Sequence, residues 1–251
     1  MTVALLDWGI GGLSVYRQLA KARPDIDFVY LSDSGSMPYG KMTKKELIQR
    51  LNDVSDFFRK KQICQIVIAC NAASTVLDEV KKKNPDLNYL GMLDSGARMI
   101  EASKAKNSLI LGGFRTIRSK YFQTHFKHSK IIIQAKVAQP LSGFIEQGDM
   151  QSEAFITSLT TVLSNLNFKP RSILLACTHY PAITSQIQKI FPRAKILDPS
   201  YYVVRQLSLG LKKADRKGSA LFFTTGNSKL MRRSGHKAFG IDIHKVQKVR
   251  L

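Results

Sequence analysis

Residues 65–74 read Gln-Ile-Val-Ile-Ala-Cys-Asn-Ala-Ala-Ser, and residues 172–181 read Ser-Ile-Leu-Leu-Ala-Cys-Thr-His-Tyr-Pro. In both stretches a short apolar run ends in a cysteine, Cys70 or Cys177, and small or polar residues follow. Such runs are typical of strands buried in a parallel sheet, whose ligands bind in the crevice beyond the carboxyl ends of the strands. The recurrence predicts two similar halves, each with one thiol facing that crevice. Two acid/base groups on opposite faces of one carbon are what inversion of a stereocentre requires.

The composition is that of an ordinary globular protein. The chain has 251 residues, of which 44% are hydrophobic, enough for one large domain or two small ones. The first eight residues lack the basic region of a signal peptide, and no apolar run approaches the roughly 20 residues of a membrane span. We therefore expect a cytoplasmic protein. Cys64, Cys70 and Cys177 lack the spacing of zinc ligands, so we expect reduced thiols and no metal.

The chain is strongly basic, with a formal net charge of +21. The densest part is 212–250, where eleven Lys and Arg residues stand against Asp215 and Asp242. Such a surface attracts small anions, including dicarboxylates, and can hold nucleic acid non-specifically. The sequence carries no zinc finger, RNA-recognition signature or basic zipper. We therefore expect nucleic acid only as a non-specific, charge-driven partner.

Apolar runs alternate with amphipathic stretches along the chain, which predicts α/β layers with mainly parallel sheets. Strands are expected at 3–6, 28–31, 66–69, 89–93, 108–112, 130–137, 172–176, 194–197 and 220–224. Helices are expected at 12–22, 74–83, 95–104, 151–165, 182–191 and 201–213. A further helix follows Thr43, since Thr43 and Glu46 have the spacing of a capping box. The chain is expected to cross between the two halves near 92–95 and near 207–213.

Two loops add polar and backbone groups to the crevice. Asp7 closes the first predicted strand, and Gly9, Gly11 and Gly12 follow it in a turn that lets backbone amides approach an anion. The spacing is not that of a dinucleotide-binding fingerprint, and a plain tight turn explains these glycines equally well. The turn at 38–40, Pro-Tyr-Gly, leaves backbone groups free to bind.

These segments together resemble the glutamate racemase family, within the aspartate/glutamate racemase superfamily. The matching motifs are Asp-Trp-Gly-Ile-Gly-Gly-Leu-Ser at 7–14, Pro-Tyr-Gly at 38–40, Cys-Asn-Ala-Ala-Ser at 70–74 and Ala-Cys-Thr-His-Tyr-Pro at 176–181. They occur in the family's order and span nearly the whole chain. The resemblance implies an isomerase that interconverts L- and D-glutamate without a cofactor, by a two-base mechanism, and supplies D-glutamate for peptidoglycan and so for cell shape.

The resemblance also implies roles for individual residues. Cys70 and Cys177 match the two acid/base thiols, with Asp7 assisting near Cys70, and His179 and Glu146 near Cys177. Asp33 is a weaker candidate. The residues that match the substrate-binding segments are Asp7, Trp8, Pro38, Tyr39, Gly40, Asn71, Ala72, Thr116, Thr178 and His179.

The resemblance further implies two similar domains related by a pseudo-twofold axis, with the active site in the crevice between them. Domain one holds residues 1–93 plus 208–251, and domain two holds 94–207. Most members of the family are homodimers, so a homodimer is expected here as well.

Four positions depart from the family pattern. Trp8 and Ala72 stand where the family has a hydroxyl residue, Gly113 stands at a common threonine, and Gln139 at a common cysteine. A lost hydroxyl partner weakens the binding of a polar ligand by roughly 0.5–1.5 kcal/mol. Three functions stay open: racemisation of glutamate, racemisation of another amino acid such as aspartate, or a catalytically impaired basic binding protein. An indole of Trp8 that points into the crevice would occupy ligand space, and one that points away would not.

Overall fold

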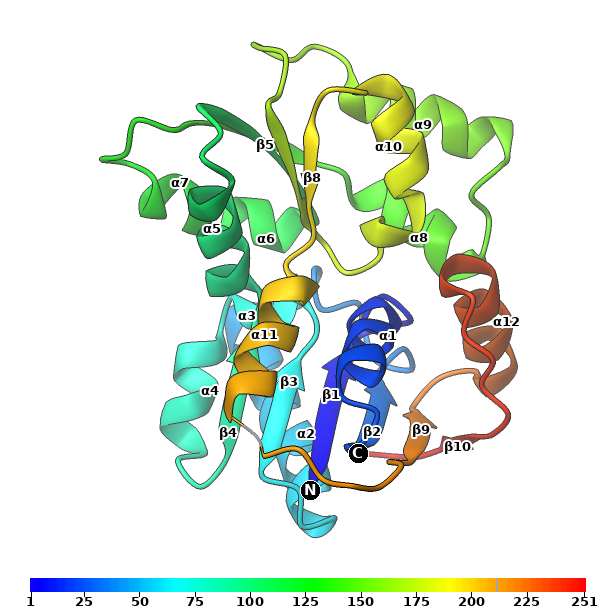
Figure 1. The fold of residues 1–251 in the computed structure, drawn as a ribbon. Helices are drawn as coiled ribbons and strands as arrows, with labels where there is room; N and C mark the ends of the chain where they lie inside the picture. Colours follow the sequence, from blue (N-terminus) through cyan, green and yellow to red (C-terminus); the bar gives the residue numbers. More distant parts are fainter. Residues whose placement is uncertain (211) are drawn as a thin grey trace.

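The computed structural model describes residues 1–210 and 212–251, which form two sheets that lie one above the other in Figure 1. The first sheet has the strand order β10-β9-β2-β1-β3-β4, and the second has the order β6-β5-β7-β8. All strand pairs within the described residues are parallel. The strands of the first sheet are β1 (Thr2–Asp7), β2 (Asp27–Ser32), β3 (Gln65–Ile68), β4 (Asn88–Gly91), β9 (Ala220–Thr224) and β10 (Val246–Lys248). Those of the second are β5 (Asn107–Gly112), β6 (Ile132–Val137), β7 (Ser172–Ala176) and β8 (Lys195–Leu197).

The two sheets repeat one strand order. The order β2-β1-β3-β4 in the first sheet corresponds to β6-β5-β7-β8 in the second, so β3 and β7 hold equivalent positions. Cys70 and Cys177 follow these two strands. The repeat that the sequence predicts is therefore present in the topology, and the predicted α/β architecture with two parallel sheets is confirmed.

Helices and connections surround both sheets (Figure 1). The helices are α1 (Leu13–Ala22), α2 (Lys44–Lys60), α3 (Asn71–Ser74), α4 (Leu77–Lys83), α5 (Met92–Ser103), α6 (Phe114–Arg118), α7 (Tyr121–His125), α8 (Gln139–Gln147), α9 (Glu153–Leu163), α10 (Thr184–Ile190), α11 (Ser200–Gly210), α12 (Ser228–Phe239) and the 3-10 turn η1 (Tyr180–Ile183). Among the residues that the structure describes, no helix is long and apolar enough to cross a membrane.

Alternation along β1 shows how the first sheet is covered on both faces. Val3 and Leu5 pack into a core that includes residues of α1 and α11, whereas Ala4 and Leu6 pack into a second core built largely on α2 and α4. Side chains of a strand alternate between faces, so a strand buried on both sides is apolar throughout. That is why the first strand reads as a continuous apolar run, and why Asp7 stands out at its end.

Most predicted strands are confirmed with ends shifted by one or two residues, and the main error lies at 89–93. There β4 ends at Gly91 and α5 begins at Met92, whose amide donates to the Ser74 hydroxyl at 3.0 Å. This distant bond satisfies one of the amides that a helix start leaves open, and the apolar pattern gives no sign of it. The short strand β10 was not predicted, because its residues, Val-Gln-Lys, form no apolar run.

The helix predictions were less accurate than the strand predictions. The predicted helix 74–83 is wrong at its start, because α3 ends at Ser74 and the Thr75 hydroxyl donates to the Ala72 carbonyl at 2.7 Å. The predicted helix 182–191 is split into η1 and α10, and the predicted helix 201–213 begins at Ser200 and is described to Gly210. Leu211, within that prediction, lies outside the described residues. Helices α6, α7, α8 and α12 were not predicted, since they are short or bury small residues such as Ser234 and Gly235 of α12.

The chain crosses between the sheets twice, through α5 after β4 and through α11 after β8. Both crossing helices pack against each other, and α11 also packs against α1 of the first sheet. The division into residues 1–93 plus 208–251 and residues 94–207 stays a prediction. In the structure, the carboxyl ends of the strands of each half face the space between the two sheets.

The predicted capping box at the start of α2 supplies a test of local stability. The Glu46 amide donates to the Thr43 hydroxyl at 3.2 Å, and the Thr43 amide donates to the Glu46 carboxylate at 2.7 Å. Replacing Thr43 by Ala removes the acceptor and is expected to lower the free energy of unfolding by about 0.5–2 kcal/mol in urea titration. The matched variant Thr43→Ser keeps the hydroxyl and should stay within a few tenths of a kcal/mol of the parent. Equal losses in both variants would contradict this account of the helix start.

Candidate active site

A cavity of about 580 Å³ lies between the two halves, at the carboxyl ends of β1, β3, β5 and β7. Ligands of parallel α/β sheets bind at this edge, and sites between domains are common. The structure brings every residue of the predicted site to this one cavity, with the exception of the weaker candidate Asp33. These are Asp7, Trp8, Pro38, Tyr39, Gly40, Cys70, Asn71, Ala72, Thr116, Glu146, Cys177, Thr178 and His179.

The Cys70 thiol, on the first half, is almost fully buried. Its side chain is 8% exposed and stands immediately before α3. Burial raises the pKa of the Cys70 thiol well above its usual value, and the nearby Asp7 carboxylate raises it further. Cys70 is therefore a neutral thiol at neutral pH, able to donate a proton.

Across the cavity, Cys177 lies beside a buried imidazole. Its Sγ is 3.7 Å from Nδ1 of His179, whose Nε2 is 2.7 Å from Oε2 of Glu146. Burial alone would lower the pKa of His179, but the contacts with Cys177 and Glu146 outweigh it and raise that pKa well above its usual value. The imidazole therefore carries its proton at neutral pH and places a positive charge beside the Cys177 sulfur.

Asp7 joins the two halves next to Cys70. Its Oδ2 accepts hydrogen bonds from the Gly12 amide at 2.5 Å and from the Thr178 hydroxyl at 3.3 Å. Its Oδ1 accepts from the Trp8 amide at 2.7 Å. Burial raises the pKa of Asp7, although the nearby His179 and the hydrogen bonds from Cys70 and Gly12 oppose that rise. The Asp7 carboxylate is thus held by Trp8, Gly12 and Thr178 and also faces the Cys70 thiol.

Two glycines allow the turn after β1 to touch the other half. A Cβ at Gly11 would lie 2.5 Å from Nδ1 of His179 and 2.7 Å from the Thr178 hydroxyl oxygen. A Cβ at Gly9 would clash with the Glu146 carboxylate. The glycine-rich turn therefore serves a close approach between the halves, an explanation more specific than the tight turn that the sequence left open.

Trp8 forms part of the cavity wall. Its indole lines the cavity, while its N–H donates to the Ser36 carbonyl at 3.1 Å. The indole is also packed against the core cluster around α2. The side chain therefore borders the ligand space with an apolar surface, and its only donor is engaged by the backbone of the neighbouring loop.

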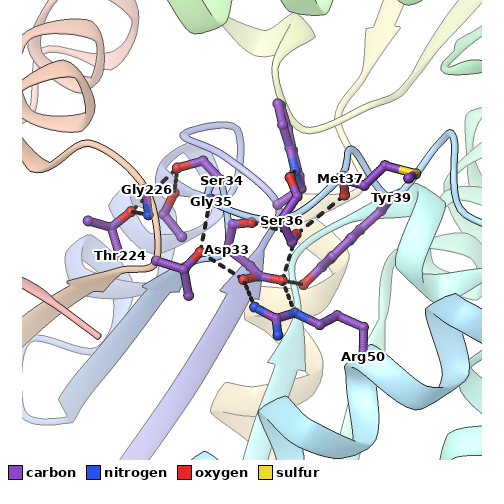
Figure 2. Close-up of polar contacts among 12 residues, drawn as sticks. Asp33, Ser34, Gly35, Ser36, Met37, Tyr39, Arg50, Thr224 and Gly226 are labelled. Carbon is purple, nitrogen blue, oxygen red and sulfur yellow. Dashed lines mark hydrogen bonds and ion pairs between the residues drawn. The ribbon is translucent and has the colours of Figure 1, made fainter. Parts of the chain in front are cut away.

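Asp33 lies outside the cavity and organises the loop that carries Tyr39 (Figure 2). Its fully buried carboxylate accepts from Arg50 at 2.8 Å (Nε to Oδ2) and 2.6 Å (Nη2 to Oδ1), and from the Tyr39 hydroxyl at 2.8 Å. The hydroxyls of Ser36 and Thr225 also donate to it, at 2.9 and 2.8 Å. Because Ser36 in turn accepts from Trp8, one buried carboxylate positions two stretches of the cavity wall.

Asn71 presents an amide without partners to the cavity. The residue is 2% exposed, and within the described part of the chain neither its Oδ1 nor its Nδ2 has a hydrogen-bond partner. A buried polar group left without a partner costs about 1–3 kcal/mol. Since Asn71 lines the cavity, a bound polar ligand would satisfy both atoms.

Gly113 and Gln139, which the sequence singled out as departures from the family pattern, also line the cavity. Sequence reasoning missed several further lining residues, which are Lys41, Phe114, Pro140, Ser142, Gly143, Gln147 and Ala176. Most of them belong to α6 and α8, the short helices that the sequence did not predict. The Gln139 side chain accepts from the Phe114 amide at 3.1 Å and so ties these two helices together. The sequence did contain a signal for α8: Pro140 lies in its first turn and Gly148 follows its end, which are the positions that proline and glycine favour in helices.

Two sheets with the same parallel strand order, each contributing one thiol to a shared cavity, form the architecture of a two-thiol amino-acid racemase, and the comparisons agree. The model of the Asp/Glu/hydantoin racemase family matches residues 4–207. The glutamate racemase of Prochlorococcus marinus strain NATL1A is 31% identical over 208 residues, covering 80% of this chain and 76% of that protein. The glutamate racemase of Carboxydothermus hydrogenoformans is 29% identical over 259 residues, covering 99% and 96%.

The fold agrees as well. The crystal structure of a glutamate racemase isoform of Bacillus anthracis superimposes with a TM-score of 0.90 at 23% identity, covering 100% of this chain and 97% of that one. The chain belongs to the Asp/Glu/hydantoin racemase family and, within it, to the glutamate racemase family. The resemblance drawn from the sequence motifs is thereby confirmed.

The pKa directions at Cys70 and Asp7 lead to a labelling prediction. Alkylation requires the thiolate, so the Cys70 peptide should react with iodoacetamide slowly at neutral pH, with a midpoint well into the alkaline range. Replacing Asp7 by Asn removes a negative charge that raises the pKa of Cys70, and it should move the midpoint to lower pH. Mass spectrometry of the labelled peptide across the neutral to alkaline range gives both midpoints. A midpoint that stays the same or moves upward in the Asp7→Asn variant would show that Asp7 does not raise the pKa of Cys70. The exposed Cys64 serves as the internal control, because its labelling shows that the reagent is active.

Proposed function

We propose that this protein interconverts L- and D-glutamate without a cofactor, using Cys70 and Cys177 as opposed acid and base. The observation that carries the proposal is that both thiols line one cavity from equivalent strands of the two sheets. One thiolate removes the α-proton from one face of the substrate, and the other residue, as a neutral thiol, returns a proton to the opposite face. The proton count is unchanged, and the two cysteines exchange protonation states in each turnover.

The neighbours of each thiol suit this exchange. On one side, protonated His179, held by Glu146, places a positive charge beside Cys177. On the other, the buried Asp7 raises the pKa of Cys70 and keeps it protonated. Whichever cysteine acts as the base toward one enantiomer of the substrate acts as the acid toward the other. A positioned acid or base contributes about 10²–10⁴-fold to such a step.

Polar groups around the thiols supply binding for an amino acid. Asn71 offers an unpartnered amide, and Thr116 and Thr178 offer hydroxyls from the second half. Pro38, Tyr39 and Gly40 form the opposite wall and are held through Asp33. Trp8 and Ala72, where hydroxyls are missing, add apolar surface.

Glutamate is favoured over the alternative substrates and over a non-catalytic role. The curated relatives that cover most of this chain are glutamate racemases, and the changes at Trp8 and Ala72 leave the thiols and their neighbours in place. From its similarity to glutamate racemases, we infer that the protein supplies D-glutamate for peptidoglycan synthesis. The cytoplasm is the proposed location, since the mechanism needs both thiols reduced. A homodimer is proposed from the family resemblance, and nucleic acid only as a non-specific partner of the +21 charge.

Serine substitutions test the two-thiol mechanism. Cys70→Ser and Cys177→Ser should each reduce racemisation of glutamate by about 10²-fold or more, because a hydroxyl is a far poorer acid and base than a thiol. The readout is circular dichroism of L- and D-glutamate, together with α-proton exchange in D₂O. Cys64→Ser, at an exposed position outside the cavity, is the matched control and should keep full activity. Retained racemisation in either active-site variant would end the two-thiol proposal.

Substrate choice is tested in the same assay with aspartate. Glutamate should exchange its α-proton faster than aspartate at equal concentration, by a factor on the order of ten or more, since one methylene less displaces a carboxylate from its partners. A faster reaction with aspartate would replace the proposed substrate and leave the mechanism standing. Exchange with neither amino acid in folded protein would remove the enzymatic proposal.

A further inference from the structure

A second cavity, of about 510 Å³, adjoins the catalytic one and is lined by cations. The two cavities share Gly40, Lys41 and Phe114. The other lining residues of this second cavity, the entrance pocket, are Met42, Lys44, Thr75, Val76, Arg115, Arg118 and Ser119. Four of its residues are Lys or Arg, and its lining includes no Asp or Glu. Its walls come from both halves of the protein, since 40–44 and 75–76 belong to the first half and 114–119 to the second.

Arg115 is the most unusual of these cations. It is half-buried, and among the residues that the structure describes its guanidinium donates only to neutral oxygens: the Thr75 hydroxyl at 3.0 Å and the Met42 carbonyl at 2.7 Å. Arg50 is also half-buried, but it forms an ion pair with Asp33, which raises its pKa. Burial lowers the pKa of Arg115, with no carboxylate to compensate. A partly buried cation without an anion is a costly arrangement that a bound anion would relieve.

Neighbouring cations leave the entrance pocket with unbalanced positive charge. Lys44 forms an ion pair with Glu79. Arg118 instead lies over the Phe114 ring, with its guanidinium carbon 3.9 Å from the ring centroid. In the described part of the chain, no ion pair is formed by Lys41, Arg115 or Arg118. A Phe ring holds a guanidinium in place without neutralising it, so the forked donors of Arg118 stay available.

We propose that the entrance pocket binds a small anion carrying two or more negative charges, of the phosphate or polycarboxylate class, at a site separate from the catalytic cavity. Arg115 and Arg118 supply planar donors that match phosphate and carboxylate oxygens, and Lys41 adds a third charge. The ligand contacts both halves, because Arg115 already bridges from α6 to Met42 and Thr75 of the first half. The proposal does not depend on the reaction proposed above, since it concerns binding alone.

Calorimetric titration at constant ionic strength tests it, with inorganic pyrophosphate in one arm and citrate in the other. Racemic glutamate is present at saturation, so that the catalytic cavity is already filled. At least one anion should bind saturably with one site per chain, and the arm that binds identifies the ligand class. Arg118→Gln, at an exposed position, should weaken binding about tenfold or more, and Arg115→Gln should do the same. The matched control is Lys45→Gln, which removes an exposed charge nearby that does not line the pocket and should leave the affinity within about twofold.

Three outcomes would overturn the proposal. Absence of saturable binding in both arms would show that the pocket is only a region of positive potential. Equal losses in Arg118→Gln and Lys45→Gln would mean that net charge, not the pocket, determines the affinity. Saturable binding that occurs only when glutamate is omitted, with no dependence on Arg118, would place the anion in the catalytic cavity. None of these outcomes bears on racemisation, which the cysteine variants test separately.

Discussion

The close contact between the turn after β1 and the second half of the chain is the constraint on which the site depends. The Ile10 amide donates at 3.0 Å to the same Glu146 oxygen that contacts His179, and the Ser14 hydroxyl donates at 3.0 Å to the Thr178 carbonyl. These bonds bring two sheets that share no strand to one cavity. Glycine at positions 9 and 11 is the condition for this approach, because a Cβ there would displace the Glu146 carboxylate or the His179 ring. Packing between halves and chemistry at the site therefore rest on the same few contacts.

The same approach explains the electrostatics. Bringing Asp7, Glu146, His179 and two thiols together out of water is expensive, and it is tolerated because His179 pairs with Glu146 and both carboxylates accept hydrogen bonds from the opposite half. Thr178 of the second half donates to Asp7 of the first, while Ile10 of the first donates to Glu146 of the second. Burial disfavours the charged form on both sides: it raises the pKa of Cys70 and holds that thiol neutral, whereas at His179 the contacts with Cys177 and Glu146 outweigh it and raise the pKa of the imidazole. Two chemically identical side chains thus lie in different electrostatic surroundings.

How far the sequence predicts this arrangement depends on the range of the interactions involved. The thiols were predictable because the repeat of an apolar run ending in cysteine is a local pattern, and parallel sheets bring strand ends together by rule. The family motifs then extended the prediction to Asp7 and His179. The partners were not predictable: the Met92 amide finds Ser74, and Gln139 finds the Phe114 amide, over separations that no local pattern encodes. The unpartnered amide of Asn71 likewise becomes visible only when its surroundings are known.

The departures from the family pattern take on a different meaning in the structure. Trp8 lacks the expected hydroxyl, but its N–H is bound by Ser36, and Ser36 is bound by Asp33. The indole is thus a wall element fixed by the same buried carboxylate that holds Tyr39, and not a loose obstruction in the ligand space. The indole that replaces the hydroxyl is in this way tied to the loop that carries Tyr39. Since a rigid wall loses less entropy on binding, the loss of a hydroxyl and the gain in preorganisation act in opposite directions on affinity. For that reason the missing hydroxyls alone do not argue for a different substrate.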